Sequence, residues 1–513
     1  LSQSLQGSVA GLTVTRSGGA ANSSATLRIR GITTIGDSNP LVLIDGIPGS
    51  IDRVNPNDVE SISVLKDAAS ASIYGSRAAA GVVLITTKRG KSNQLSIDYT
   101  FEYGIETPTA VPKQVDAATT MRMRNERIWN GVDNTGSEYP LYPKELIDNY
   151  ANLHVENPDL YPDADWYKKL IRNSTPRKSH ILSFSGGNQF VKTKASLDYS
   201  QIGGLYEGKD YNRFTFRVNN DITPNKYLSG FIDINGLMND AKDPVVTLTP
   251  NMNYPASLFA PTWSDGRITQ GDAASLNLLA RLQQGGSIRR NGQSFGGRVG
   301  VNITPIDGLK ITGIFSPTIN ISSEKNFSKK IPFTRLETPE IIAGYIGGHL
   351  NTNLLETRSH DYAFTTQFLV NYDKKFKGHS VGILGGYENY YSFNESLNAS
   401  RLNYELSDYP YLNIGNQNFQ YNAGEASEYA YRSWFGRVGY DYMGKYLLQI
   451  NSRFDASSRF AKGYRLGIFP SVSAGWVISE EKFFSKIEFL SYTKLRASWG
   501  TLGNERIGSL YPY

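Results

Sequence analysis

The sequence predicts an all-β membrane protein, an antiparallel transmembrane β-barrel that encloses an N-terminal α/β plug domain. Three observations lead to this fold class. After residue 91 the chain carries about 13 segments of strand length in which apolar and polar residues alternate. The connections between these segments are alternately short and long, and the first 91 residues follow a different pattern. We therefore assign residues 1–91 to the plug and residues 92–513 to the barrel.

Three short apolar runs near the N-terminus predict a small mixed sheet. Leu41–Ile44, Ile62–Leu65 and Val82–Ile85 are mostly β-branched or aliphatic and are bounded by Gly, Pro, Asn or Asp, as buried strands are. Between the last two runs, Asp67–Tyr74 is rich in Ala and Ser and is followed by Gly75. This pattern predicts a short capped helix that ends before Gly75.

The alternation of the later segments is clearest in residues 361–373. Apolar or aromatic residues dominate one face there, with one Thr among them: Tyr362, Phe364, Thr366, Phe368, Val370 and Tyr372. Residues 445–455 repeat the design, and their polar face carries Gln449, Asn451, Arg453 and Asp455. A soluble sandwich of two sheets would show the same alternation, so this pattern by itself leaves both architectures open.

The lengths of the connections favour the membrane barrel. Tight turns are expected at 188–189, 223–226, 304–308, 374–378 and 443–444, and longer links at 105–177, 203–210, 238–294, 320–360, 391–430 and 455–467. Outer-membrane barrels have short turns on one side and long loops on the other, whereas a sandwich gives no reason for this alternation. Aromatic residues near the segment ends fit the interfacial girdles of such a barrel. The link 105–177 also contains helix-like pieces at 117–129 and 144–152.

The direction of the last segment indicates an incomplete chain. If the segment at 95–104 runs outward, alternation brings the thirteenth, near 492–500, outward again. Single-chain bacterial barrels have an even number of strands. We therefore expect further strands after Tyr513. The start at Leu1, without an initiator Met, leads us to expect missing residues at the N-terminus as well.

Composition restricts the function classes. The chain has no Cys and only 5 His, none with metal-ligand spacing, so a thiolate metal site and a cysteine nucleophile are excluded. We expect no catalytic site, no metal and no cofactor. A net charge of +6 without a long basic run argues against nucleic acid as a partner. No apolar stretch approaches the roughly 18 residues of a membrane helix.

Several motifs resemble those of one family. The plug carries Arg30-Gly31, Leu41-Val42-Leu43-Ile44-Asp45-Gly46 and Ala80-Gly81-Val82-Val83-Leu84-Ile85-Thr86-Thr87. The barrel carries Tyr211-Asn212-Arg213-Phe214, Phe469-Pro470-Ser471-Val472-Ser473-Ala474-Gly475-Trp476 and Leu495-Arg496-Ala497-Ser498-Trp499-Gly500. Together with Lys66-Asp67-Ala68-Ala69-Ser70-Ala71-Ser72-Ile73-Tyr74-Gly75, they resemble the SusC/RagA branch of TonB-dependent outer-membrane transporters of Bacteroidota.

The resemblance implies a barrel of 22 strands occluded by the plug and set in outer-membrane lipid. It also implies active import of an oligosaccharide or an oligopeptide. The implied partners are a SusD-like surface lipoprotein, which acts as a lid, and the TonB-ExbB-ExbD complex, which supplies the energy. Two alternatives remain: a passive outer-membrane porin, which the plug argues against, and a soluble glycan-binding β-protein.

Three sets of residues are candidates for function. Arg28 and Arg30 flank Ile29 and are expected to latch the plug to carboxylates, with Glu60 as one candidate, because guanidinium binds carboxylates in a bidentate manner; an exposed strand face is the alternative. The loop at the plug apex, by the resemblance, can contact substrate through Thr33, Thr34, Asp37, Ser38 and Asn39, although turns use the same residue types. Three loop aromatics could stack on sugar rings, form a docking surface for a lid protein or serve local packing: Tyr254, Phe259 and Trp263.

Overall fold

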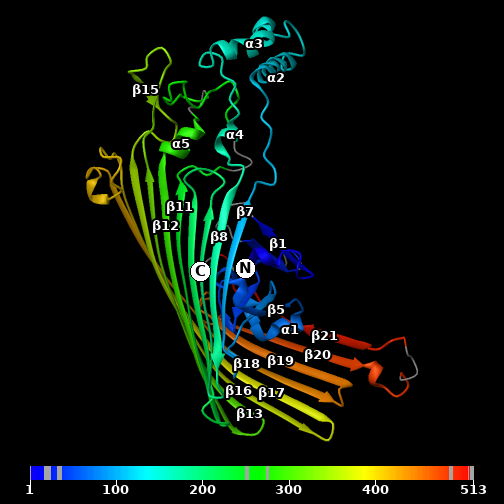
Figure 1. The fold of residues 1–513 in the computed structure, drawn as a ribbon. Helices are drawn as coiled ribbons and strands as arrows, with labels where there is room; N and C mark the ends of the chain where they lie inside the picture. The colour runs from blue at the N-terminus through cyan, green and yellow to red at the C-terminus, as the bar shows by residue number, and fades with distance from the viewer. Residues whose placement is uncertain are drawn as a thin grey trace.

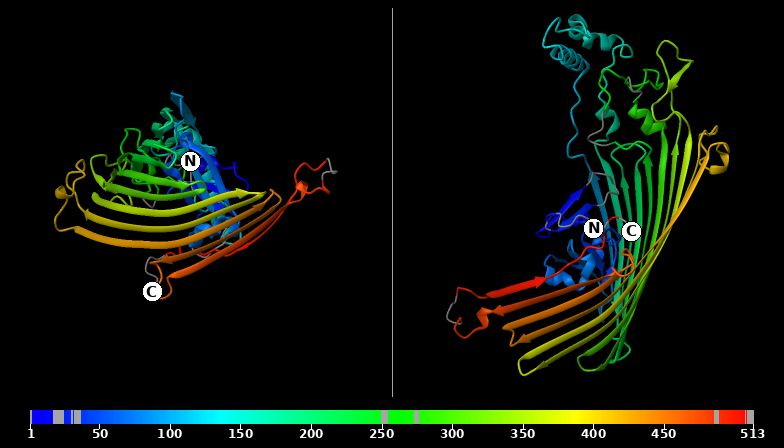
Figure 2. Two further views of the ribbon diagram at one scale, coloured as in Figure 1. Left: turned by 90° about the horizontal axis from the view of Figure 1, so that it is seen from below. Right: turned by 180° about the vertical axis from the view of Figure 1, so that it is seen from behind.

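The chain forms an N-terminal plug and a single curved sheet of 13 strands, which we call the wall (Figure 1). The computed structural model describes residues 2–16, 25–29, 31, 37–248, 254–272, 276–484, 489–506 and 508. The plug lies on the concave side of the wall (Figure 2). Over the described ranges, no helix combines the length and apolar character needed to cross a membrane.

The plug contains two small sheets. In the first, β1 (Leu12–Arg16) pairs with β2 (Ala25–Ile29) in antiparallel register. The second has the strand order β4-β3-β6-β5. Its members are β3 (Leu41–Ile44), β4 (Ile47–Pro48), β5 (Val59–Leu65) and β6 (Val82–Thr87). Since β3 and β6 are parallel and the other pairs antiparallel, the predicted mixed sheet is confirmed.

Strand β6 is the centre of the plug core. Val83 and Ile85 face the first sheet and pack among Leu27 and Ile29. On the opposite side, Val82 joins a second cluster: Leu41, Leu43, Ala71 and Ala78. Burial on both faces explains why β6 is apolar almost throughout rather than alternating. Short 3-10 turns complete the plug: η1 (Ser2–Leu5), η2 (Ile51–Arg53) and η3 (Pro56–Asp58).

The short helix of the plug differs from its prediction at the C-terminal end. The helical segment α1 (Ala68–Ala71) continues into η4 (Ser72–Arg77), so the helical region passes through Gly75 instead of ending before it. Gly75 has φ 59° and ψ −130°, a conformation open essentially to glycine alone. It therefore kinks the segment and redirects Arg77.

The wall is one continuous antiparallel sheet in which each strand pairs with the next wall strand along the chain. Its strands are β7 (Ser96–Glu106), β8 (Thr175–Gly187), β9 (Val191–Gly203), β10 (Asp210–Ile222), β11 (Leu228–Pro244), β12 (Gly286–Ile306), β13 (Leu309–Ser328), β16 (Asn353–Phe376), β17 (His379–Arg401), β18 (Gln420–Tyr442), β19 (Tyr446–Ser457), β20 (Leu466–Val477) and β21 (Lys494–Gly500). The predicted tight turns all join consecutive wall strands. The predicted boundary after residue 91 falls in the connection between β6 and β7.

The two faces of the wall differ in polarity. In β9, Leu197 is 45% exposed whereas its neighbour Asp198 is 7% exposed, and in β11 Ile234 is 49% exposed whereas Asp233 is 3% exposed. The buried polar side chains are on the plug side, and the exposed apolar ones are on the outer side. This is the arrangement of a membrane barrel with a polar interior, and it differs from two sheets stacked over a shared apolar core.

The loops on the far side from the tight turns carry most of the remaining elements (Figure 1). The first of these loops holds α2 (Ala117–Asn130) and α3 (Lys144–Glu156), where helix-like pieces are predicted, and α4 (Trp166–Leu170), which is not predicted as a helix. Others hold α5 (Leu278–Gln284), the hairpin of β14 (Pro332–Thr334) and β15 (Ile342–Tyr345), and η5 (Leu412–Ile414), whereas η6 (Ile478–Glu480) lies in the link from β20 to β21, on the side of the tight turns. Several links are shorter than predicted because strands such as β16, with 24 residues, exceed the roughly 10 needed to span a bilayer.

Candidate functional site

We name two groups of contacts between the plug and the inner face of the wall by the wall strands involved. At the β17–β20 interface, the kinked segment η4 meets β17, β18, β19 and β20. At the β10–β13 interface, the turn after β3 and the end of β6 meet β10, β11, β12 and β13. Both interfaces depend on ionised side chains, and they differ in how much water can reach them.

Arg77 anchors the plug at the β17–β20 interface. Its Nη2 lies 2.7 Å from Oε1 of Glu388, and the side chains are 8% and 7% exposed. The guanidinium also lies 3.9 Å from the centroid of the Tyr431 ring, whose hydroxyl donates to the same carboxylate at 2.7 Å. Gln367 donates to the other oxygen of Glu388 at 2.7 Å. Glu388 is thus fully bonded in a dry environment, where charge-assisted hydrogen bonds are strong.

Arg453 of β19 joins the same cluster from the wall. It lies 3.3 Å from Glu388 and 2.6 Å from Asp455, and it donates to the carbonyl of Ile73 at 2.8 Å. Asp455 in turn accepts from the backbone N–H of Ser76 at 2.6 Å. Two guanidinium groups therefore meet two carboxylates, so that the cluster of Arg77, Glu388, Arg453 and Asp455 is balanced in charge.

Gly75 allows this close approach. A Cβ at that position would lie 2.0 Å from Oδ2 of Asp455 and 2.8 Å from Cδ of Arg453. Only glycine leaves room for both wall side chains while adopting the positive φ of the kink.

Asp233 of β11 is the centre of the β10–β13 interface. Arg89 of the plug donates to its two oxygens at 2.6 and 2.9 Å, in bidentate geometry. Arg298 of β12 donates to Oδ2 at 2.9 and 2.6 Å, and its guanidinium lies 4.1 Å from the centroid of the Phe231 ring. Asp221 lies 3.4 Å from Arg89 and provides a second carboxylate.

The turn after β3 is held against the same strands. Arg298 donates to the carbonyl of Asp45, a residue with φ 50° at the head of the β3–β4 hairpin. The carboxylate of Asp45 accepts from the N–H and the hydroxyl of Thr87, at 2.9 and 2.7 Å. Asn219 of β10 donates to the Thr87 hydroxyl at 2.9 Å and to the Lys88 carbonyl at 2.9 Å. The end of β6 is thus attached to both the hairpin and the wall.

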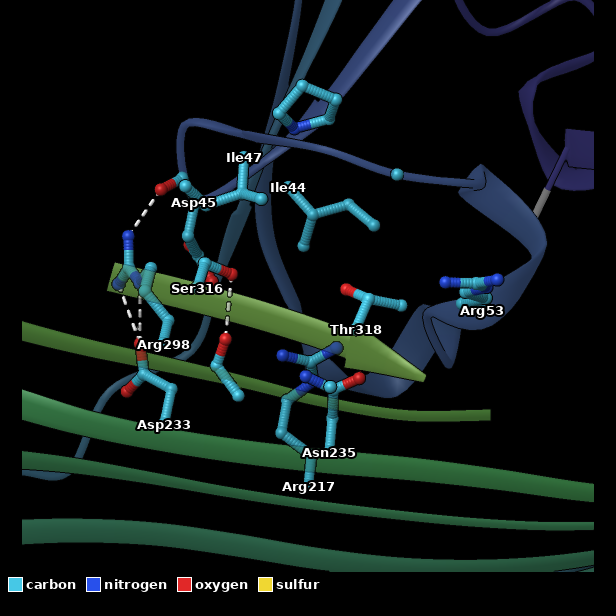
Figure 3. Close-up of a pocket in the computed structure, with 14 residues that line it drawn as sticks. Ile44, Asp45, Ile47, Arg53, Arg217, Asp233, Asn235, Arg298, Ser316 and Thr318 are labelled. Carbon is cyan, nitrogen blue, oxygen red and sulfur yellow. Dashed lines mark hydrogen bonds and ion pairs between the residues drawn. The ribbon is translucent and has the colours of Figure 1, made fainter. Parts of the chain in front are cut away.

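A cavity of about 60 Å³ separates the turn after β3 from the wall strands beside it (Figure 3). Polar side chains from both sides line it, among them Arg53, Arg217, Asn235 and Thr318. A volume of this size holds a few water molecules, since one needs about 10–15 Å³. The β10–β13 interface therefore has room for water, whereas the charged side chains of the β17–β20 interface are closely packed.

The pKa values of the plug arginines reflect these surroundings. Burial alone would lower the pKa of Arg77, but Tyr431 and Glu388 hold that pKa above its ordinary value. The pKa of Arg89 is also raised, because hydrogen bonding and attraction from Asp233 outweigh burial. At Arg53 burial prevails and lowers the pKa. Both anchoring arginines are consequently held in the charged form.

Two of the three predicted latch residues lie within the described part of the chain. Arg28 is half-buried on β2, Glu60 is exposed on β5, and within the described part of the chain these two form no ion pair with each other. Arg30 lies outside the described residues. The arginines that do bind wall carboxylates, Arg77 and Arg89, were missed because a plug arginine carries no local mark of a partner hundreds of residues away. On the wall side, the polar face predicted for residues 445–455 already contains Arg453 and Asp455.

The apex and loop candidates are only partly described. Thr33 and Thr34 lie outside the described residues, Asp37 and Ser38 are half-buried and Asn39 is exposed. Asn39 donates to the carboxylate of Asp37 from its backbone at 2.9 Å and from its side chain at 2.7 Å.

The three loop aromatics make local contacts. The Tyr254 ring lies 4.2 Å from that of Tyr167, Phe259 lies 5.6 Å from the Arg124 guanidinium, and Trp263 donates from Nε1 to the carbonyl of Thr334 at 3.0 Å. In the portion of the chain that the structure describes, no cluster of His, Cys, Asp or Glu is suited to hold a metal ion.

Comparison with known proteins supports this architecture. Residues 1–82 match the model of the TonB-dependent receptor plug domain. A TonB-dependent receptor of Formosa agariphila is 32% identical over 99% of this chain and 46% of its own length, and the TonB-dependent receptor SusC of Bacteroides thetaiotaomicron is 27% identical over 99% of this chain and 50% of its own length. The solved RagAB peptide transporter is 26% identical with a TM-score of 0.82, covering 99% of this chain and 59% of that one.

The chain spans about half the length of the curated relatives it matches. Over that length it has the plug, the single antiparallel wall with a polar inner face, and likenesses to SusC and to RagAB. The chain belongs to the SusC/RagA family of TonB-dependent outer-membrane transporters.

Proposed function

We propose that the whole protein actively imports an oligosaccharide or an oligopeptide across the outer membrane. It acts as the SusC-like barrel of a complex with a SusD-like surface lipoprotein, and TonB-ExbB-ExbD supplies the energy. The plug-apex residues Asp37, Ser38 and Asn39 contact the ligand in this proposal, together with Thr33 and Thr34. Likeness to a solved peptide transporter supports the peptide class, and the oligosaccharide class stays open from the family resemblance.

The observation that carries the proposal is the attachment of the plug. Ionised side chains join it to the wall at two interfaces, so a solute can pass only after some of these bonds are exchanged. A passive porin has no use for such an occlusion. Because binding at equilibrium cannot concentrate a solute, the rearrangement must be driven from outside, which is the role proposed for TonB.

The experiment compares uptake with and without the energy source. The full-length protein and its SusD-like partner are produced in a Bacteroidota host that is either TonB-intact or TonB-deficient, and the cells receive two labelled probes, a casein peptide digest and a pool of plant-glycan oligosaccharides. We expect uptake of one probe, lost in the TonB-deficient host. Equal uptake in both hosts would contradict active import and favour a porin. A host that makes the barrel without the SusD-like lipoprotein tests whether that lipoprotein is needed as a lid.

A further inference from the structure

Residues 501–506, which follow β21, leave the wall and cross to the plug; we call this segment the strap. Thr501 still donates to the carbonyl of Pro470 in β20, at 3.0 Å. The next residue, Leu502, packs against the plug cluster that contains Leu41 and Leu43. The strap thus begins as a wall strand and becomes part of the plug surface within two residues.

Gly503 marks the tightest point of this crossing. A Cβ there would lie 2.5 Å from Cε1 of Phe469 on β20 and 3.4 Å from Cα of Ser76 in η4. At Gly503 the strap therefore passes between the wall and the plug as bare backbone, and a side chain at this position would collide with Phe469.

The far end of the strap binds Asp37 at the plug apex. The N–H of Asp37 donates to the carbonyl of Arg506 at 3.0 Å, and Nη1 of Arg506 donates to the Asp37 carboxylate at 3.0 Å. Nδ2 of Asn504 lies 3.4 Å from the Asp37 carbonyl. Partial burial alone would raise the pKa of Asp37, but the hydrogen bond from the Asn39 backbone and the charge of Arg506 hold it below its ordinary value.

The middle of the strap reaches the β17–β20 interface. Glu505 is 2% exposed, its N–H donates to the carbonyl of Ser76 at 3.0 Å, and its carboxylate accepts from the hydroxyl of Tyr429. The second carboxylate oxygen of Glu505 is buried without a hydrogen-bond partner. Because Ser76 precedes Arg77, three consecutive strap residues connect the apex to the buried ion-pair cluster.

We propose that the strap is a clamp that holds the plug apex against the wall and is displaced when the apex binds its ligand. The backbone N–H, the carbonyl and the carboxylate of Asp37 are all engaged by the strap or by Asn39, so a ligand that engages Asp37 must displace Arg506. Displacement also draws Glu505 away from Ser76, which loosens the backbone next to Arg77. The existence of a ligand rests on the proposed function, but the clamp itself can be tested without one.

The test measures amide hydrogen exchange of the full-length protein in detergent by mass spectrometry. In the Asp37→Asn/Arg506→Gln variant we expect exchange in residues 37–48 and in residues 72–78 to rise at least about tenfold, the factor expected for loss of one charge-assisted hydrogen bond. The matched control is Lys329→Gln/Asp408→Asn, which removes an ion pair of 2.8 Å in the outer loops. It should leave exchange in the plug unchanged.

A cross-link provides the opposite perturbation, since residues 1–513 contain no Cys that could compete for it. Asp37→Cys/Arg506→Cys joins two residues whose backbones are hydrogen-bonded, and its oxidation should slow exchange in residues 72–78 relative to the reduced form. The control pair is Ser179→Cys/Ser200→Cys, directly opposite each other on β8 and β9.

Two results would overturn the clamp: wild-type exchange in residues 72–78 of the Asp37→Asn/Arg506→Gln variant, or equal exchange in the oxidised and reduced cross-linked forms. Neither depends on transport. If the exchange results hold while uptake proves independent of TonB, the clamp stands and the proposed function fails.

Discussion

The β17–β20 and β10–β13 interfaces between plug and wall use the same chemistry in different surroundings. At the β17–β20 interface, the side chains of Arg77, Glu388, Arg453 and Asp455 are between 2% and 8% exposed. At the β10–β13 interface, Asp233 is equally buried, but Arg89 is 27% exposed and a cavity lies beside it.

This difference determines what each interface loses when one partner is removed. A buried ion that loses its partner stays uncompensated in a dry site, which costs about 3–5 kcal/mol. Beside a cavity, water and neighbouring carboxylates can take over part of the interaction, and the cost falls. We therefore expect the β17–β20 interface to be the firm attachment of the plug and the β10–β13 interface to open more readily.

The largest effect is expected for Glu388→Gln. The substitution leaves Arg77 and Arg453 without their shared carboxylate, so local opening of the plug should become easier by about 3–5 kcal/mol. Hydrogen exchange in residues 72–87 of the full-length protein measures this. Glu395→Gln, an exposed residue on the same strand, is the control and should not change it. A decrease of less than about 1 kcal/mol in the free energy of local opening would show that the cluster does not anchor the plug.

A comparison of two glycines separates backbone strain from crowding. Gly75→Ala places a side chain on a backbone with positive φ and brings its Cβ against Asp455. We therefore expect the free energy of unfolding to fall by about 3 kcal/mol. Gly46→Ala, in the hairpin at the other interface, has φ 88° but meets nothing within 4 Å, and should cost about 1 kcal/mol. Thermal unfolding of the two variants in detergent checks this order. Equal losses would mean that crowding at Gly75 contributes nothing.

Asp233→Asn tests the hydrated interface directly. Arg89 and Arg298 lose their charged acceptor, but Asp221 stays within reach of Arg89, so the expected cost is about 2 kcal/mol, less than for Glu388→Gln. The same exchange measurement, made on residues 82–91, supplies the value. If Asp233→Asn proved costlier than Glu388→Gln, our ranking of the two interfaces would be reversed.

The smallest effect is expected where the cavity leaves space. Gly297 lines the cavity, and a Cβ there would make only ordinary contacts, at 3.7 Å or more from its nearest neighbours. Gly297→Ala should change stability by less than about 0.5 kcal/mol. Thermal unfolding of this variant, beside Gly75→Ala, shows whether the wall tolerates a methyl group on the hydrated side. A loss above 1 kcal/mol would indicate that the interface is packed rather than open.

Much of the fold could be predicted because its signals are local. Alternation of apolar and polar residues identifies each wall strand. Apolar runs flanked by Gly, Pro, Asn or Asp identify β3 and β6. The end of the short plug helix could not be predicted in the same way. A glycine such as Gly75 fits both the end of a helix and a kink within one. The contacts with Asp455 and Arg453, which require the kink, appear only in the tertiary structure.

The candidate site also has features that local sequence patterns predict and features that they do not. The inward position of Arg453 and Asp455 follows from the two-residue repeat of a strand, so their exposure to the plug could be anticipated. Their pairing with the segment around Arg77 could not, because it joins residues more than 370 positions apart. The predicted latch of Arg28, Arg30 and Glu60 rested on residue type and on the shared side of the two arginines, and it stays a prediction. The structure describes ion pairs with wall carboxylates for two other plug arginines, Arg77 and Arg89.

The amino-acid sequence by itself therefore determined that this protein is a membrane barrel with a plug, since period and turn spacing are properties of neighbouring residues. Tertiary structure alone decided which charges meet, where water enters and how the strap reaches Asp37. Those features depend on how the plug is positioned against the curved wall, and no short segment of the chain specifies that position.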